Sequence, residues 1–317
     1  MKAAVVLSAG AIPQYLDFPE PEVSPGMQVV ELVASAVHPV VRAKADGVHY
    51  SSTDVYPMIP GVDAVARDAG GRLLYAGETQ LPWGTFAERM AVAIAAPLPE
   101  GADPVAVAAG MNPGMSSWMP LTGHAGEFGA PATVLVLGAT GAAGRLAVQN
   151  AQVVGAGRVI GVGRGARDLE RVAELGAQTV ELSGDLDGDS RAIAAALDDA
   201  SPDLVLDYLW GMPAEAALRA LDSMPGHEPI SYVEIGDIAG GEARVPGSLL
   251  RGRPFRLSGS GIGSFDMRRY LREAQAYLKI IGDGTVTVEA AAYPLQECAE
   301  AWTAGPGPRP VLVSESS

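Results

Sequence analysis

Apolar residues follow two different patterns in the two parts of the chain. Up to about residue 110, short apolar stretches such as 27–33 and 86–92 alternate with turns rich in proline and glycine. This pattern is typical of a β-rich, barrel-like domain. After Pro131, apolar stretches of strand length alternate with segments whose apolar residues have a helical spacing. We therefore expect an α/β protein with a β-rich part followed by an alternating part.

The second part predicts a doubly wound parallel sheet of the Rossmann type. Residues 133–137 are continuously apolar, which is typical of a strand buried on both faces of a parallel sheet. Strands that alternate with helices form right-handed βαβ crossovers. Five further strands are expected at 158–162, 179–182, 204–207, 230–235 and 255–258, with helices near 144–154, 169–175, 190–197, 214–221 and 267–281.

The C-terminal tail returns to a strand-like pattern at 285–291 and 311–313. Two interpretations are open, a loose extension or a return of the chain to the first domain. We favour the return, because the tail ends in a strand and an unpaired strand leaves its backbone groups without partners.

A glycine-rich turn separates the first strand of the parallel sheet from its helix. Backbone N–H groups and the positive end of the helix dipole at such a junction bind a pyrophosphate, and small residues let it approach closely. Glycine spacing alone is weak evidence in a chain with 39 glycines, and a tight turn without a ligand is the alternative. The strand before it and the helix after it favour a dinucleotide site. The turn reads Gly138-Ala139-Thr140-Gly141-Ala142-Ala143-Gly144.

The residues after the second strand of this sheet bear on the choice of cofactor. NAD sites usually carry an acidic residue there for the ribose diol, whereas NADP sites place an arginine near the 2′-phosphate. This strand ends without an acid, and Arg164 and Arg167 follow it. Guanidinium groups suit a phosphate dianion, so NADP(H) is the expected cofactor. The alternative is that both arginines are surface residues paired with Asp168 and Glu170.

Composition and charge exclude several classes of function. The 317 residues are 48% hydrophobic and 19% charged, so a sizeable core is available. A net charge of −15 disfavours nucleic acid and anionic membranes as partners. Cys298 is the single cysteine, and no apolar run approaches the length of a membrane span or a secretory leader. We expect a cytoplasmic protein with neither nucleic-acid nor membrane partners.

Metal-binding patterns are missing from the sequence. Catalytic zinc needs three protein ligands and structural zinc typically four cysteines, and the histidines lie at scattered positions 38, 49, 124 and 227. No zinc-protease, nucleophile-elbow or Walker motif occurs. We therefore predict no metal site. Hydride transfer needs none of these patterns, because the cofactor carries the chemistry and the protein orients the substrate.

The order of short motifs along nearly the whole chain resembles the zinc-independent quinone oxidoreductase branch (zeta-crystallin-like, enoyl-reductase) of the medium-chain dehydrogenase/reductase superfamily. Besides the glycine turn, the landmarks are Met1-Lys2-Ala3, Ala36-Val37-His38-Pro39, Ile59-Pro60-Gly61-Val62-Asp63, Gly84-Thr85-Phe86-Ala87-Glu88, Val233-Glu234-Ile235-Gly236 and Leu257-Ser258-Gly259-Ser260. The resemblance implies a GroES-like β-barrel substrate domain from residues 1–112 and 286–317 and a Rossmann NADP(H)-binding domain from 113–285. It also implies an active site in the cleft between them and a homodimer.

The resemblance also implies which residues contact the cofactor. The turn would hold the pyrophosphate, with residues 140–143 closest, and Gly163 would join the two arginines near the 2′-phosphate. Ser116 or Ser117 would lie near the nicotinamide ribose. The nicotinamide side would be lined by Ile235, Gly236, Gly259, Ser260 and Gly261.

His38 and Tyr50 are the expected proton donors. The resemblance places both segments over the nicotinamide, and an imidazole with a pKa near 6.5 could donate at neutral pH without zinc. The alternative for His38 is a buried imidazole whose nitrogens form hydrogen bonds with the backbone. The alternative for Tyr50 is a side chain that only packs beside the cleft entrance. Met58, Trp83 and Trp118 are expected to make the cleft apolar, although core packing would explain each of them.

The expected activity is hydride delivery from NADPH to an α,β-unsaturated carbonyl or a quinone that is small and apolar. A zinc-free alcohol or ketone reductase is the alternative within enzymes. A non-catalytic NADPH-binding structural or sensor protein is the alternative outside them.

Overall fold

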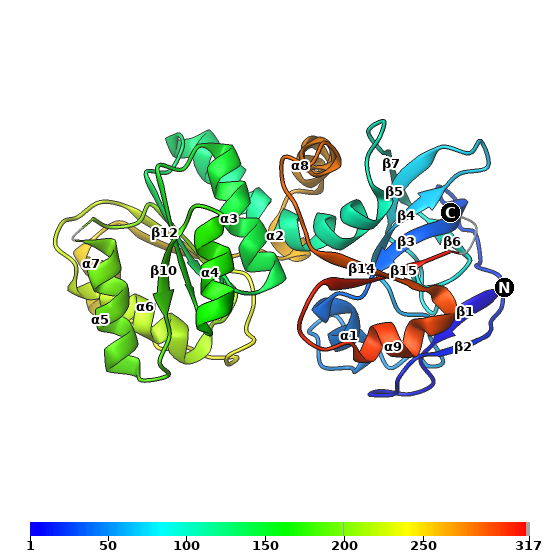
Figure 1. The fold of residues 1–317 in the computed structure, drawn as a ribbon, viewed down its shortest axis with the longest axis horizontal. Coiled ribbons are helices and arrows are strands. Elements are labelled where there is room, and N and C mark those ends of the chain that lie inside the picture. The colour runs from blue at the N-terminus through cyan, green and yellow to red at the C-terminus, as the bar shows by residue number, and fades with distance from the viewer. Residues whose placement is uncertain (199, 315–317) are drawn as a thin grey trace. The chain divides into compact units, whose positions relative to one another are not determined.

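The computed structural model describes residues 1–198 and 200–314. The chain divides into two compact units, the first made of Met1–Asn112 with Gln275–Ser317 and the second of Pro113–Ala274. Figure 1 labels the elements of both units. Two helices, α2 (Pro104–Phe128) and α8 (Met267–Gly282), contain the points at which the chain passes from one unit to the other.

The second unit contains a six-stranded parallel sheet, which confirms the predicted Rossmann-type fold. Its strand order is β10-β9-β8-β11-β12-β13, and every adjacent pair is parallel. All six expected strands occur, with ends that differ by one residue at most from the prediction. Their bounds are β8 Thr133–Leu137, β9 Arg158–Gly163, β10 Gln178–Glu181, β11 Leu204–Asp207, β12 Ile230–Glu234 and β13 Phe255–Gly259.

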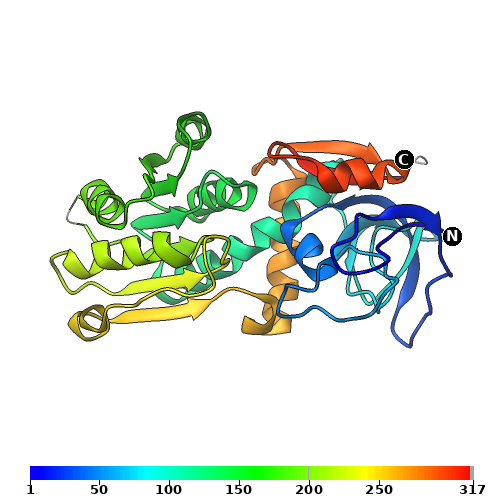
Figure 2. The ribbon, with the colours of Figure 1, turned by 90° about the horizontal axis from the view of Figure 1, so that it is seen from below.

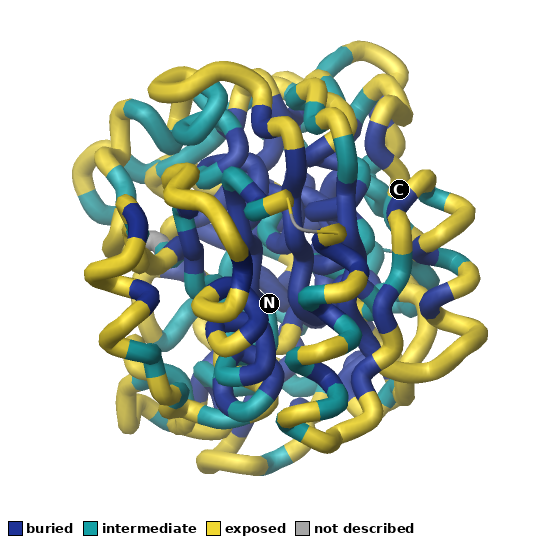
Figure 3. Tube along the Cα trace, turned by 90° about the vertical axis from the view of Figure 1, so that its left-hand side faces the viewer, coloured by how far each residue is buried: buried dark blue, intermediate teal, exposed yellow. Residues whose placement is uncertain are grey.

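Helices cover both faces of this sheet, which explains the continuous apolar sequence of β8. Its five residues are all buried. Leu135 and Leu137 pack in the core that contains residues of α5 and α6, whereas Val134 and Val136 pack with α3 on the opposite face. Figures 1 and 2 show these helices on the two sides of the sheet, and Figure 3 shows the buried strands as dark blue tracts.

The predicted helices of this unit are confirmed, and most of them begin earlier than expected. Apolar spacing marks only the turns that pack against the sheet. In α5 the additional first turn is capped by Asp185, whose carboxylate accepts a hydrogen bond from the N–H of Gly188 at 2.7 Å. The bounds are α3 Ala142–Val154, α4 Ala166–Glu174, α5 Leu186–Leu197 and α6 Gly211–Ser223. A short helix α7 at Gly247–Gly252 and a 3₁₀ helix η1 at Ile262–Ser264 were not predicted.

The first unit is a sheet domain whose strands pair antiparallel except for β14 and β15. A seven-stranded sheet has the order β14-β15-β3-β4-β5-β7 with β6 also paired to β3, and β1 and β2 form a separate hairpin. The strands are β1 Lys2–Val5, β2 Gln14–Asp17, β3 Gln28–Ala36, β4 Asp63–Arg67, β5 Leu73–Gly77, β6 Arg89–Val92, β7 Ile94–Pro97, β14 Ala290–Pro294 and β15 Arg309–Val313. The helices are α1 Pro39–Ala45, η2 Leu295–Glu297 and α9 Cys298–Thr303.

The C-terminal tail pairs with the first unit. Val311 of β15 lies opposite Ala36 of β3 in antiparallel register, and β14 runs parallel to β15. The strand expected at 285–291 is wrong in its bounds, because β14 begins only at Ala290. Residues 285–289 follow α8 and include the turn in which Asp283 accepts hydrogen bonds from Thr285.

The 25-residue helix α2 was not expected from the sequence, because Pro113 and Pro120 lie inside it. Proline removes one backbone donor and usually interrupts a helix. The helix is instead held by tertiary contacts, such as the Arg269 guanidinium that donates to the carbonyl of Met119 at 2.6 Å. Among the described helices, α2 included, none is both long enough and apolar enough to span a membrane.

Candidate functional site

The glycine turn follows β8 directly and is tied to the neighbouring strand β9. The N–H groups of Gly138 and Ala139 both donate to the carbonyl of Val162, at 2.8 and 3.0 Å, and the N–H of Gly141 donates back to Gly138 at 3.1 Å. Gly138 has a φ of +84°, in the left-handed region that favours glycine. The predicted turn therefore forms at the carboxyl end of the central strand.

The helix α3 starts in close contact with this turn. A Cβ atom on Gly144 would lie 2.2 Å from the carbonyl oxygen of Gly138 and 2.7 Å from the Cα of Ala139, so only glycine fits there. Gly141 is exposed, and Ala142 is half-buried. The first N–H groups of a helix have no intrahelical acceptor. Open backbone donors at the positive end of a 13-residue helix fit a pyrophosphate.

Two arginines flank this cradle after β9. Arg164 and Arg167 are both exposed, and neither forms an ion pair within the part of the chain that the structure describes. The alternative in which they pair with Asp168 and Glu170 is therefore not observed. Two free guanidinium groups at this strand end fit the extra phosphate of NADP(H).

A hydrogen-bonded cluster of residues from α2 and from the ends of β11 and β13 lies in the same unit. The Ser260 hydroxyl donates to the carbonyl of Ser116 at 2.7 Å, and the Ser116 hydroxyl lies 3.1 Å from the phenol oxygen of Tyr208. That carbonyl is open because its helical partner would be residue 120, and Pro120 has no N–H to donate. Because Pro120 has no N–H, the Ser116 carbonyl can accept the hydrogen bond from Ser260.

Ser117 has a different environment from Ser116. It is fully buried, its hydroxyl donates to the carbonyl of Gly114 at 3.1 Å, and it accepts from the amide of Asn150 at 2.9 Å. These bonds hold α2 against α3. Of the two serines named for the nicotinamide ribose, Ser116 is the more accessible.

The remaining predicted cofactor residues lie at the carboxyl ends of β12 and β13. The N–H groups of Ile235 and Gly236 donate to the carbonyl of Asp207, at 2.7 and 3.2 Å. Gly259 ends β13, and the N–H of Gly261 donates to the hydroxyl of Ser264 at 2.8 Å. The carboxyl ends of parallel strands share one edge, and strand order reverses between β8 and β11. Ligands of open α/β sheets bind at this switch point.

Asp207 and the backbone N–H groups of Leu209 and Trp210 were not predicted from the sequence as part of the site. The buried carboxylate of Asp207 accepts hydrogen bonds from the N–H groups of Leu209 and Trp210 and from the hydroxyl of Tyr232 at 2.7 Å. Burial raises its pKa above the usual range. Trp210 has a φ of +51°, a strained conformation that is often found at functional sites. The sequence signal that could have identified Asp207 is an acidic residue at the end of a buried apolar strand.

His38 lies in the first unit as the N-cap of α1 and is only 1% exposed. Burial, together with the positive charge of Arg309, lowers its pKa to about 3, so the imidazole is neutral at pH 7. The expected pKa near 6.5 is therefore wrong for this residue. Its Nε2 lies 3.7 Å from Oδ1 of Asp63, and burial raises the pKa of Asp63 to about 6 even though the Tyr75 hydroxyl donates to it at 2.6 Å.

Tyr50 differs from His38 in exposure. Its side chain is 79% exposed and stacks beside His49 with ring centroids 4.1 Å apart. No hydrogen-bond partner of the phenol is observed in the described part of the chain. The side chain of Tyr50 is therefore accessible to solvent, whereas that of His38 is buried.

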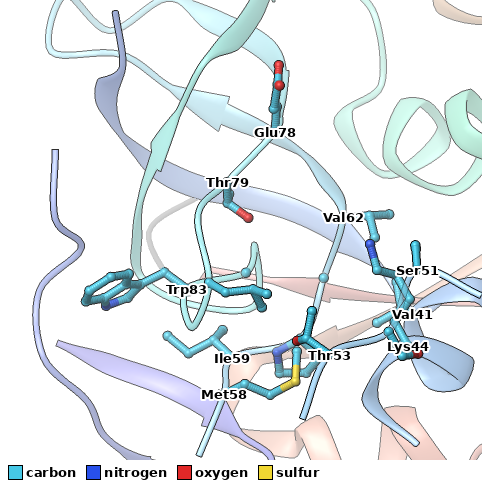
Figure 4. Close-up of a pocket in the computed structure, with 15 residues that line it drawn as sticks. Val41, Lys44, Ser51, Thr53, Met58, Ile59, Val62, Glu78, Thr79 and Trp83 are labelled. Atoms are coloured by element: carbon cyan, nitrogen blue, oxygen red, sulfur yellow. The ribbon is translucent and has the colours of Figure 1, made fainter. Parts of the chain in front are cut away.

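A cavity of about 260 Å³ lies in the first unit. Met58 and Trp83, two of the three residues expected to make the site apolar, line it together with Val41, Lys44 and Val62 (Figure 4). The third, Trp118, belongs to the second unit, where its indole N–H donates to Glu273 at 2.9 Å.

No group of three or more histidine, cysteine, aspartate and glutamate side chains within residues 1–198 and 200–314 is placed to hold a metal ion. His38 and Asp63 approach each other as a pair without a third ligand.

Comparisons with known proteins identify relatives over nearly the whole chain. No protein-family profile matches the chain. A probable NADPH-dependent quinone reductase, tdiC of Emericella nidulans, is 30% identical over 95% of this chain and 96% of its own length. The quinone oxidoreductase of Thermus thermophilus, solved also in complex with NADPH, matches with a TM-score of 0.82 and 26% identity over 99% of this chain and all of its own.

More distant structures share the fold. An alcohol dehydrogenase superfamily protein from Novosphingobium aromaticivorans has a TM-score of 0.81 at 21% identity, over 99% of this chain and all of its own. The similarity in sequence and in fold extends over nearly the full length of the chain and of its relatives. The chain belongs to the quinone oxidoreductase branch of the medium-chain dehydrogenase/reductase superfamily.

Proposed function

We propose that this protein is an NADPH-dependent oxidoreductase that reduces a quinone or an α,β-unsaturated carbonyl without a metal ion. The observation that carries the proposal is the open phosphate cradle at the start of α3, together with Arg164 and Arg167, which form no ion pair with any residue that the structure describes. The quinone reductases among its relatives support the substrate class.

The residues of the second unit fit an NADPH molecule at the carboxyl edge of its sheet. The amides of residues 140–143 would hold the pyrophosphate, and Gly163, Arg164 and Arg167 the 2′-phosphate. Ser116 or Ser117 would lie near the nicotinamide ribose. The nicotinamide side would be lined by Ile235, Gly236, Gly259, Ser260 and Gly261. When bound, the cofactor supplies a hydride, and the residues around it fix its position and exclude water.

The chain's own part in the chemistry is to stabilise negative charge on the substrate oxygen and to supply a proton. A preorganised hydrogen-bond donor near that oxygen does the first. His38 is neutral at pH 7, so it would act through a ring N–H rather than as an imidazolium ion. Tyr50 would act through its exposed phenol. His38 and Tyr50 are therefore both proposed as donors of a hydrogen bond and a proton to the substrate oxygen.

We further propose that residues 1–112 and 286–317 hold the substrate and residues 113–285 the cofactor, in a cytoplasmic homodimer. The single cysteine, which leaves no internal disulfide to form, fits a reducing compartment. The net charge of −15 argues against nucleic acid as a partner.

The cofactor assignment is tested by Arg164→Ala combined with Arg167→Ala. A hydrogen bond to a charged group contributes about 1.5–3 kcal/mol, and exposure reduces this. We expect the Kd for NADPH to rise about tenfold to a hundredfold while that for NADH barely changes, as measured by fluorescence titration. Arg72→Ala with Arg89→Ala is the control for the loss of two positive charges, because both arginines lie in the first unit, where they pair with Asp68 and Glu20. Equal losses for both cofactors would refute the 2′-phosphate assignment.

A further inference from the structure

The cavity of the first unit has one charged wall. It lies among α1, the segment 51–62 and the segment 78–84. Figure 4 shows Val41 and Lys44 on one side, Trp83 on the opposite side, and Met58 and Thr53 below. Its walls combine apolar side chains with serine and threonine hydroxyls, and Lys44 and Glu78 are its two charged residues.

Lys44 is the unusual feature of this wall. The chain has three lysines, at positions 2, 44 and 279, against an excess of acidic residues that leaves a net charge of −15. Lys2 pairs with Asp17 at 3.0 Å, whereas the half-buried Lys44 has no ion pair or side-chain hydrogen bond within the described residues. An ammonium group partly withdrawn from water is stabilised by an anionic partner.

The acid that also lines the cavity does not neutralise Lys44. Glu78 is exposed, and Figure 4 shows its carboxylate pointing away from the other labelled side chains. The neighbouring Arg42 on α1 donates to the carbonyl of Ala301, so its guanidinium is already engaged. The positive charge of Lys44 is therefore available to a ligand in the cavity.

The apolar walls define the rest of the ligand. Met58 is 8% exposed, and Trp83 lies across the cavity from Val62. Flat apolar surfaces suit a planar ring. A volume of about 260 Å³ lies just below the usual range of ligand-site volumes, about 300–1,000 Å³, which limits the ligand to about one or two fused rings.

We propose that this cavity binds the substrate as a planar anionic ring compound, a quinone bearing an ionised hydroxyl or carboxylate that pairs with Lys44. The inference rests on the proposed quinone reductase function and narrows its substrate class. It makes Lys44 a specificity-determining residue, because a neutral quinone of the same size gains nothing from the ammonium group.

Two quinones that share a ring system test this selectivity. 1,4-Naphthoquinone is neutral, and 2-hydroxy-1,4-naphthoquinone is an anion at neutral pH. Binding of each is measured by isothermal titration calorimetry without NADPH, and turnover is measured separately by NADPH oxidation. The variants are Lys44→Met, which keeps the length but removes the charge, and Lys44→Arg, which keeps the charge. Lys279→Met on α8 is the matched control for the loss of one lysine.

We expect Lys44→Met to raise the Kd of the hydroxylated quinone about tenfold or more, the effect of one charge-assisted hydrogen bond. The Kd of the neutral quinone should change less than about twofold, and Lys44→Arg and Lys279→Met should behave like the wild type. Equal affinity of both quinones in the wild type, or no selective loss in Lys44→Met, would overturn the inference while leaving the reductase function intact. Selective binding without any NADPH oxidation would overturn the proposed function instead.

Discussion

Gly144 offers the sharpest test of the cofactor cradle, because the structure leaves no room for a side chain there. In Gly144→Ala the new Cβ would lie 2.2 Å from the carbonyl oxygen of Gly138 and 2.7 Å from the Cα of Ala139. Both contacts are with backbone, so the turn or the start of α3 must move. Overpacking typically costs about 1–3 kcal/mol, and the rigid neighbours put this site at the upper end.

The gain in helix propensity offsets part of that cost. Alanine is favoured over glycine inside a helix by about 1 kcal/mol. The net loss for Gly144→Ala is therefore about 2 kcal/mol. For a unit of 150–250 residues this corresponds to a melting temperature lower by about 4–8 °C.

Gly141→Ala is the matched control at the same turn. Gly141 caps α3 with a φ of −75°, and its added Cβ would meet no atom closer than the carbonyl oxygen of Gly138 at 3.4 Å. The weaker N-cap costs alanine about 0.5–1 kcal/mol, and the stiffer unfolded chain returns a similar amount. Thermal unfolding followed by circular dichroism should show a lower midpoint for Gly144→Ala and an unchanged midpoint for Gly141→Ala. The opposite order, or two equal midpoints, would refute this account of the turn.

Two further predictions concern buried polar groups. Because the folded-state pKa of His38 is lowered to about 3 against 6.5 unfolded, its contribution to stability is complete above pH 6.5 and is lost as pH falls towards 3. The difference in free energy of unfolding between the wild type and His38→Gln, measured by urea unfolding, should therefore fall by about 2 kcal/mol between pH 6.5 and pH 5. If that difference does not change with pH, burial does not lower the pKa of His38. Tyr232→Phe leaves the buried Oδ2 of Asp207 without its 2.7 Å donor, so it should lower the free energy of unfolding by about 1–3 kcal/mol, and an unchanged urea midpoint would show that this bond adds nothing.

Local patterns predicted the parallel-sheet unit well. The continuous apolar sequence of β8 reflects burial on both faces, and the glycines after it mark a positive φ at Gly138 and a close contact at Gly144. These constraints act between residues that are neighbours in sequence. They can therefore be recognised without knowledge of the tertiary structure.

The helix α2 escaped prediction for the opposite reason. Pro120 frees the carbonyl of Ser116, and a distant residue, Ser260, satisfies it. No property of residues 104–128 alone indicates that Ser260 will donate a hydrogen bond to the Ser116 carbonyl. The lowered pKa of His38 has a similar origin, since it depends on burial and on Arg309, which is far along the chain.

The candidate site therefore divides into a part set by local sequence and a part assembled from distant segments. The phosphate cradle uses backbone amides that a glycine turn presents wherever it follows a buried strand. The cavity beside Lys44 instead collects side chains from α1, from 51–62 and from 78–84, and its selectivity depends on which of them meet. Substitutions in those segments can change the preferred ring compound while the cradle of the second unit keeps its glycines. We therefore expect relatives that keep the glycine turn but differ in these three segments to use the same cofactor and to act on different substrates.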